Sequence, residues 1–186
     1  MSSTQMQMVS AQLETLVHDF RHSMEEARKL LTSADEEPLR KRQSPSTWSA
    51  LECAVHLNLS TQAMLPGIRE AVEAAPPNTG GAQTFKMDLP GRVLAWSLEP
   101  PAFIRMTAPK LAQPSASEEP QIVLQEFERL HNELIDLLHA SAGKAIDKQK
   151  LKSPFANMHY NTYSAFRIIA AHDRRHLWQA RKALGR

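Results

Sequence analysis

The chain has 186 residues, enough for one domain with a complete hydrophobic core. Aromatic residues make up only 6% of the sequence and glycine occurs six times, a composition that disfavours a sheet-rich fold. The 22 lysines and arginines nearly balance the 20 aspartates and glutamates, so the formal charge of +2 does not indicate binding to nucleic acid or to an anionic membrane.

The single cysteine and the first residues indicate a cellular compartment. Cys53 has no second cysteine for an intrachain disulfide, which favours a reducing cytoplasm. Residues 1–10 are polar and lack the basic start and apolar segment of a signal peptide. No apolar run approaches the roughly 18 residues of a membrane helix. We therefore expect a cytoplasmic protein that does not bind membranes.

The first half of the chain predicts two long helices, at residues 8–31 and 48–74. Apolar residues recur in both at steps of three and four. Ser49 and Glu52 form a capping-box pattern at the start of the second helix. This helix is apolar on nearly all sides, as a buried helix would be, and Pro66 is expected to kink or divide it.

The connection between residues 76 and 120 is unusually long and contains eight of the twelve prolines. Loops longer than about 15 residues are usually functional or disordered. We expect a short helix at residues 91–98 and otherwise extended chain across one end or side of the other helices. Its apolar residues are expected to be buried: Val93, Leu94, Trp96, Leu98, Phe103, Ile104 and Met106.

Two further helices are predicted at residues 118–140 and 161–184. Residues 115–119 are expected to cap the first of these, and Pro154 precedes the second. On the last helix the basic residues fall mostly opposite the apolar face and are expected to be solvated: Arg167, Arg174, Arg181 and Lys182. Together the four helices predict a single all-α domain over residues 1–186, a four-helix bundle with a long proline-rich crossover between its second and third helices.

Two pairs of histidines are spaced four residues apart, so each pair would project from one face of its helix. His172 and His176 point about 40° to 80° from the middle of their apolar stripe, at the edge of the core. His18 and His22 point roughly 150° or more from theirs and are expected to face solvent. Two imidazoles at this spacing can chelate a divalent metal, and a third from another helix would complete a site with room for water or substrate.

Three other histidines are also candidates for the site. His56 is flanked by small groups, including Cys53 and Ser60, that leave room for a cavity. Taken alone, it is more simply a hydrogen-bonded core histidine than a third ligand. His131 lies near the apolar face of its helix, where a buried and satisfied histidine is favoured over a fourth ligand or a partner of a ligand. His159 could approach the mouth of a pocket.

Asp173 falls within the apolar stripe of the last helix, where an unpaired carboxylate would be costly. We expect it to pair with an arginine in a structural salt bridge or with the second nitrogen of a ligand histidine. Gln179 shares the pocket side with His176 and could bind water or substrate. Cys53 is interpreted as a small buried hydrophobe in preference to a soft metal ligand. The sequence has no His-Glu-x-x-His motif, no phosphate-binding or dinucleotide loop and no nucleophile-elbow serine.

Three stretches carry a resemblance to a known family. They are Trp48-Ser49-Ala50-Leu51-Glu52 with Val55-His56-Leu57, the connection with Pro100-Pro101 and Thr107-Ala108-Pro109, and Ala171-His172-Asp173-Arg174-Arg175-His176-Leu177-Trp178-Gln179. They resemble motifs of the DinB/YfiT-like superfamily of metal-binding four-helix bundles, which is unrelated to the DNA polymerase called DinB. The resemblance spans roughly residues 46–184. It implies a triad of His56, His172 and His176 that binds zinc, nickel or a similar divalent ion.

The resemblance also implies an activity. Three neutral imidazoles leave a metal with open positions, at which it could acidify water, polarise a carbonyl or hold a thiolate. Relatives include thiol-dependent transferases and isomerases and proteins described as hydrolases. We expect a thiol-transferase or hydrolase that uses the metal, and in the first case a low-molecular-weight thiol, on a small-molecule substrate in a pocket covered by residues 76–120.

The alternative is a non-catalytic helical-bundle module for binding or interaction, such as a homodimer, with a structural metal or none. A closed fourth ligand would favour it. A role in DNA damage would rest on the family name alone, and the near-neutral charge argues against nucleic acid as a partner.

Overall fold

The computed structural model describes residues 10–32, 35–79, 84–101, 107–115 and 117–186. The described residues form six α-helices, one short 3₁₀ helix and a two-stranded antiparallel sheet. The elements are α1 (Ala11–Thr32), α2 (Glu36–Arg40), α3 (Ala50–Ala74), α4 (Leu89–Leu98), η1 (Lys110–Ala112), α5 (Pro120–Ala140), β1 (Lys150–Lys152), β2 (His159–Asn161) and α6 (Thr162–Ala183).

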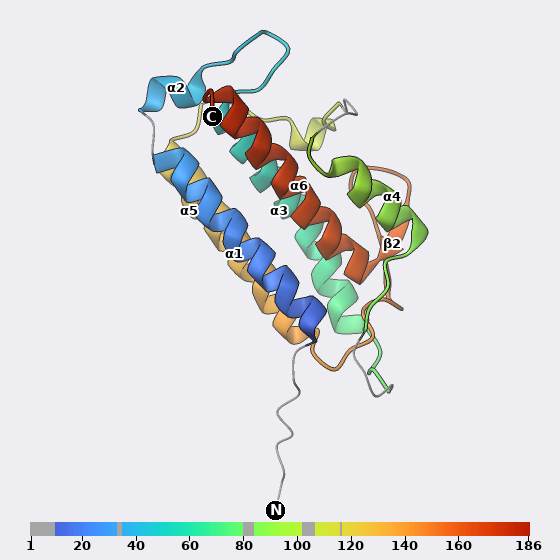
Figure 1. Cartoon of the computed structure of the whole chain (residues 1–186). Coiled ribbons are helices and arrows are strands. Elements are labelled where there is room, and N and C mark those ends of the chain that lie inside the picture. The colour runs from blue at the N-terminus through green and yellow to red at the C-terminus, as the bar shows by residue number, and fades with distance from the viewer. Residues whose placement is uncertain (1–9, 33–34, 80–83, 102–106, 116) are drawn as a thin grey trace, which may run out of the picture.

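The four long helices α1, α3, α5 and α6 pack side by side as a bundle (Figure 1). Around the bundle, α1 contacts α5 and α6, and α3 contacts the same two helices from the opposite corner. Buried apolar side chains from all four helices fill the centre. The prediction of an all-α four-helix bundle is therefore confirmed.

The direction of the helices explains why the crossover is long. The C-terminal ends of α3 and α5 lie together, as two hydrogen bonds between the segments that follow them show. Asn78 N–H donates to the Gly143 carbonyl at 2.8 Å, and Ala145 N–H donates to the Pro76 carbonyl at 2.8 Å. The two helices therefore run parallel, and the chain must return along the whole bundle between them. The 25 residues of α3 alone span about 37 Å.

The start of α3 is fixed by the capping box that the sequence predicts. The Ser49 hydroxyl accepts from the Glu52 N–H, and the Glu52 carboxylate accepts from the Ser49 N–H at 2.9 Å. Arg42 also binds this carboxylate. Pro66 does not divide the helix, which continues to Ala74. In the turn preceding α3, the Gln43 amide donates to the Ala183 carbonyl at 2.6 Å, which joins this turn to the end of α6.

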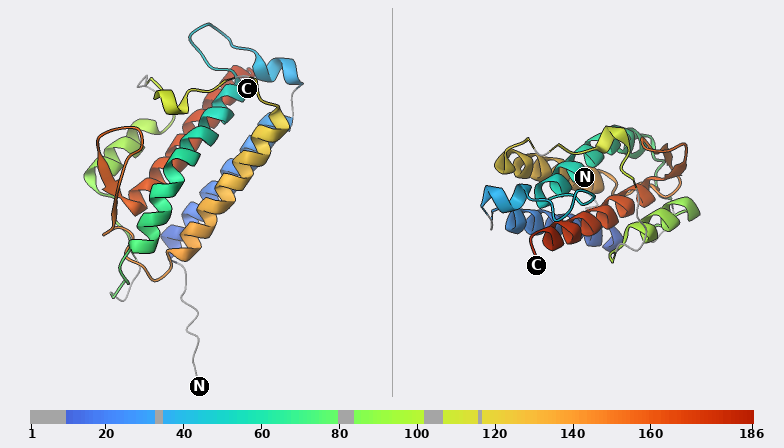
Figure 2. Two further views of the ribbon diagram at one scale, coloured as in Figure 1. Left: turned by 180° about the vertical axis from the view of Figure 1, so that it is seen from behind. Right: turned by 90° about the horizontal axis from the view of Figure 1, so that it is seen from above.

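The crossover places α4 flat against α6 on one side of the bundle, and the β1–β2 hairpin lies on the same side (Figures 1 and 2). Asp88 caps α4 by accepting from the Gly91 N–H, and its carboxylate also accepts from the Ser164 hydroxyl at 2.9 Å. The backbones approach so closely that a Cβ on Gly91 would lie 2.3 Å from the Cβ of Ser164. Glycine at this position is therefore required by contact with α6.

Two predictions about the crossover are wrong. Val93 and Trp96 were expected to be buried but are 56% and 72% exposed, because α4 turns only one face towards α6. Residues 115–119 do not supply a side-chain cap for α5, since its N-cap residue Glu119 makes no such hydrogen bond. Leu98 is buried as expected, whereas Phe103, Ile104 and Met106 lie outside the described residues, as does the predicted helix start at residue 8.

Two basic residues of α6 are less exposed to solvent than the sequence predicts. Arg174 donates to both oxygens of Glu99 and lies 3.3 Å from a carboxylate oxygen of Asp19. Arg181 forms an ion pair with Glu26. Both arginines are therefore only partly exposed, because they join α6 to neighbouring elements. Within the described part of the chain, no helix combines the length and apolar character needed to cross a membrane.

Candidate metal centre

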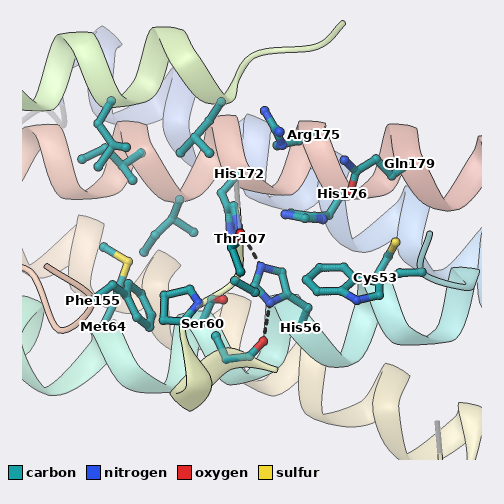
Figure 3. A pocket seen from close by; sticks show the side chains of 18 of the residues that line it. Cys53, His56, Ser60, Met64, Thr107, Phe155, His172, Arg175, His176 and Gln179 are labelled. Carbon is teal, nitrogen blue, oxygen red and sulfur yellow. Dashed lines mark hydrogen bonds between the residues drawn. The ribbon is translucent and has the colours of Figure 1, made fainter. Parts of the chain in front are cut away.

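Three histidines from two neighbouring helices converge at one point of the bundle. His56 lies on α3, and His172 and His176 lie one turn apart on α6. One nitrogen of each ring lies within 4.8 Å of the others, a separation at which all three could bind one metal ion. Figure 3 shows the three rings grouped on one wall of a pocket. By contrast, His18 and His22 are exposed on α1, as the direction of their side chains predicts.

The hydrogen bonds of His56 determine which nitrogen carries its proton. Nδ1 lies 2.5 Å from the carbonyl oxygen of Ala112, and a carbonyl can only accept a hydrogen bond. Nδ1 must therefore be protonated, which leaves a lone pair on Nε2. That lone pair faces Nε2 of His172 at 3.1 Å. In a typical metal-binding histidine, one ring nitrogen donates to a carbonyl or carboxylate, and the other nitrogen is unprotonated and free to bind the metal.

The three rings are uncharged at neutral pH. Burial lowers the pKa of His56, and burial together with the charges of its neighbours lowers the pKa of His172 to about 3. The pKa of His176 is lowered for the same reasons, and Arg175 adds to the effect on both α6 histidines. Nδ1 of His176 is also buried without a hydrogen-bond partner among the described residues. Neutral imidazoles and an unsatisfied nitrogen fit a divalent cation.

The triad borders a cavity of about 770 Å³ between the bundle and the crossover. Gln179 and Ser60, both predicted pocket residues, line this cavity. Cys53 lines it as well, but burial raises the pKa of its thiol to about 12. The thiol is therefore protonated at neutral pH, as the interpretation of Cys53 as a buried hydrophobe requires.

The crossover forms part of the cavity wall, and the segment after β1 forms another part. The lining residues that the crossover contributes are Leu94, Leu98, Thr107, Ala108, Pro109 and Ala112. The hairpin contributes Ser153, Phe155, Ala156, Met158 and Tyr160. His159 is exposed on β2 and is not among the residues that line the cavity.

Asp173 and His131 are brought together in the core and not in the cavity. His131 Nε2 lies 2.8 Å from Asp173 Oδ2, and both side chains are fully buried. His131 Nδ1 must be protonated because it donates to the Phe127 carbonyl. The short Nε2–Oδ2 contact therefore needs one further proton, on either the ring or the carboxyl. The partner of Asp173 is neither an arginine nor a histidine of the triad.

Sequence reasoning missed several groups of the site. The Trp48 ring lies 4.7 Å from that of His56 and 5.7 Å from that of His176. Its position before the N-cap predicts only the helix start. Arg175 is buried beside the triad and donates to the Ser97 carbonyl, a placement that its spacing of three from His172 could have indicated. No sequence signal marks the Ala112 carbonyl.

One comparison with known proteins gives a match. The family model described as the DinB superfamily matches residues 19–180 of the chain. This range includes all three histidines of the triad. No curated protein and no solved structure matches the chain.

We predict that the His172→Ala variant loses bound metal. Removing one of three ligands should weaken zinc or nickel binding by more than about 100-fold, beyond the effect of losing a supporting partner. Metal content after dialysis, measured by mass spectrometry, and competition with a chelator provide the test. His22→Ala is the matched control, because His22 belongs to a pair of the same spacing. A His172→Ala protein with undiminished metal would contradict the assignment.

Acid should destabilise the metal-free protein through the triad. Below the unfolded-state pKa of about 6.5, the unfolded chain binds protons that the buried rings cannot bind. The free energy of unfolding should therefore fall as the pH is lowered, by up to about 1.4 kcal/mol per pH unit for each ring. For His172 the loss should continue towards pH 3.

Urea unfolding at pH 8, 6.5 and 5 measures this dependence. The His172→Phe variant should show a shallower loss of stability than the wild type between pH 6.5 and 5. His22→Phe should show the wild-type slope. Equal slopes for all three proteins would mean that the triad is not held uncharged.

Proposed function

The chain belongs to the DinB superfamily, and from this we propose that it is a metal-dependent enzyme acting on a small molecule in the cavity beside the triad. The observation that carries the proposal is the position of three uncharged imidazoles on the wall of a large cavity. The described residues offer no fourth ligand within the cluster. A site with three protein ligands leaves room for substrate, whereas a structural site is closed by four.

Zinc and nickel are the ions we propose. Imidazole suits both, and the donor set contains no carboxylate that would favour magnesium, calcium or manganese. Such an ion, when bound, lowers the pKa of water or of a thiol and polarises a carbonyl group.

The residues around the triad hold and orient it. The Ala112 carbonyl fixes the tautomer and direction of the His56 ring. Trp48 packs against His56 and His176 and restricts both rings. Gln179 and Ser60 place polar groups on the cavity wall, where they can bind a substrate.

The choice of nucleophile depends on which general bases line the cavity. Among the described residues that line the cavity, none is an aspartate or glutamate that could act as a general base. A thiol, with an ordinary pKa near 8.5, needs less help to ionise than water does. We therefore favour transfer to or from a low-molecular-weight thiol over hydrolysis.

A non-catalytic interaction module is the second candidate, and one surface favours it. Leu89, Val93 and Trp96 are 64%, 56% and 72% exposed and follow one another along one face of α4. Such an apolar face is suited to a protein partner, including a second copy of the chain. Three expectations from the sequence remain predictions: a homodimer, a cytoplasmic location and no binding to nucleic acid.

We predict thiol consumption that depends on the triad. Zinc- or nickel-loaded protein would be incubated with 1-chloro-2,4-dinitrobenzene and cysteine, glutathione or coenzyme A, and separately with 4-nitrophenyl acetate without thiol. Wild type and His22→Ala should accelerate at least one thiol reaction, and His172→Ala should not. Acceleration of ester cleavage alone would indicate a hydrolase. If the wild type never exceeds His172→Ala, the non-catalytic module is the better account.

A further inference from the structure

The triad divides the cavity into two unlike ends. Helices α3 and α6 run antiparallel, because the turn before α3 binds the end of α6 through Gln43 and the Ala183 carbonyl. Cys53 therefore lies at the same end as Gln179, and Met64 lies at the same end as Ile168. Figure 3 shows Met64 and Phe155 on one side of the triad, and Cys53 and Gln179 on the other. The end beyond Gln179 also contains polar residues of the turn before α3 and Lys182.

The other end is made almost entirely of apolar side chains, and we name it the apolar lobe. It is lined by Met64, Leu94, Phe155, Met158 and Ile168. Two of the described lining residues are charged: Arg175, which lies between His172 and His176 on α6, and Lys182, which lies beyond His176. The hairpin also contributes two polar residues to the cavity wall, Ser153 and Tyr160.

The apolar lobe is too long to be a packing defect. His56 and Met64 are eight residues apart on α3, which corresponds to about 12 Å along the helix. Protein interiors are close-packed, with few voids larger than a water molecule. An apolar cavity of this size that opens onto a cluster of polar groups is typical of a site that binds an apolar ligand.

We propose that the apolar lobe binds a hydrocarbon group of the substrate, either an alkyl chain or an aromatic ring, while the reactive group of the same molecule lies beside the triad. The inference rests on the proposed function and adds the substrate class to it. A charged group in the apolar lobe would lose its hydration, and none of the residues that line the lobe carries a charge that could compensate for this. The end of the cavity beyond Gln179, which contains the polar residues, would bind the second reactant.

Methionine NMR tests the apolar lobe without relying on activity. Zinc-loaded protein with ¹³C-labelled methionine methyl groups would be titrated with butan-1-ol, hexan-1-ol and octan-1-ol, and the titration repeated after chelation. The methyl signals of Met64 and Met158 should shift, and that of Met24, which packs on the core and does not line the cavity, should not. Each added methylene should tighten binding by about fourfold until the lobe is full.

Two neighbouring residues of α4 supply matched variants. Leu94 lines the cavity, whereas Val93 faces outward. Leu94→Ser should weaken octanol binding by about fivefold or more, and Val93→Ser should leave it unchanged. Equal effects of the two variants, or octanol binding without shifts at Met64 and Met158, would overturn the inference.

A second pair of ligands separates this inference from the proposed function. Acetohydroxamate and octanohydroxamate share a metal-chelating head and differ only in the length of the chain. Both should bind metal-loaded protein in calorimetry, the longer one more tightly, and Leu94→Ser should weaken only the longer. Equal affinities would overturn the inference and leave an open metal site intact. If neither hydroxamate binds, the proposed function fails, and the alcohol titration still decides the apolar lobe.

Discussion

The close packing of α3 against α6 brings together three imidazole rings that are uncharged at neutral pH, and the candidate site depends on this contact. Burial lowers the pKa of each ring, so protons cannot occupy the lone pairs at neutral pH. Nε2 of His56 and Nε2 of His172 lie 3.1 Å apart. A divalent cation satisfies all three rings at once, and this is the physical reason for placing a metal there.

The topology of the bundle then supplies the pocket. Because α3 and α5 run parallel, the chain between them must travel back along the bundle, and it does so over the α3–α6 face that carries the triad. On the way it contributes α4 as a wall and the Ala112 carbonyl as a support for His56. The hairpin before α6 completes the wall with Phe155 and Met158. The segment that connects α3 to α5 therefore also forms part of the cavity wall.

Sequence alone predicts the parts that depend on periodicity and fails for those that depend on contacts between distant segments. The four long helices follow from the spacing of apolar residues, and side-chain direction separates His172 from the equally spaced His18. His56 joins the predicted triad only through the family resemblance. The strands are too short, at three residues each, to show an alternation. The partner of Asp173 and the exposure of Trp96 depend on how helices face one another, which no local pattern encodes.

The central claim is that the triad holds one divalent ion with a position left open. A crystal structure of the zinc- or nickel-loaded protein, with anomalous diffraction data at the absorption edge of the metal, tests it most directly. The account predicts a single anomalous peak about 2.0–2.1 Å from one nitrogen of His56, His172 and His176. It also predicts solvent or substrate in the remaining coordination. A shell without these nitrogens, or one closed by a fourth protein side chain, would contradict it.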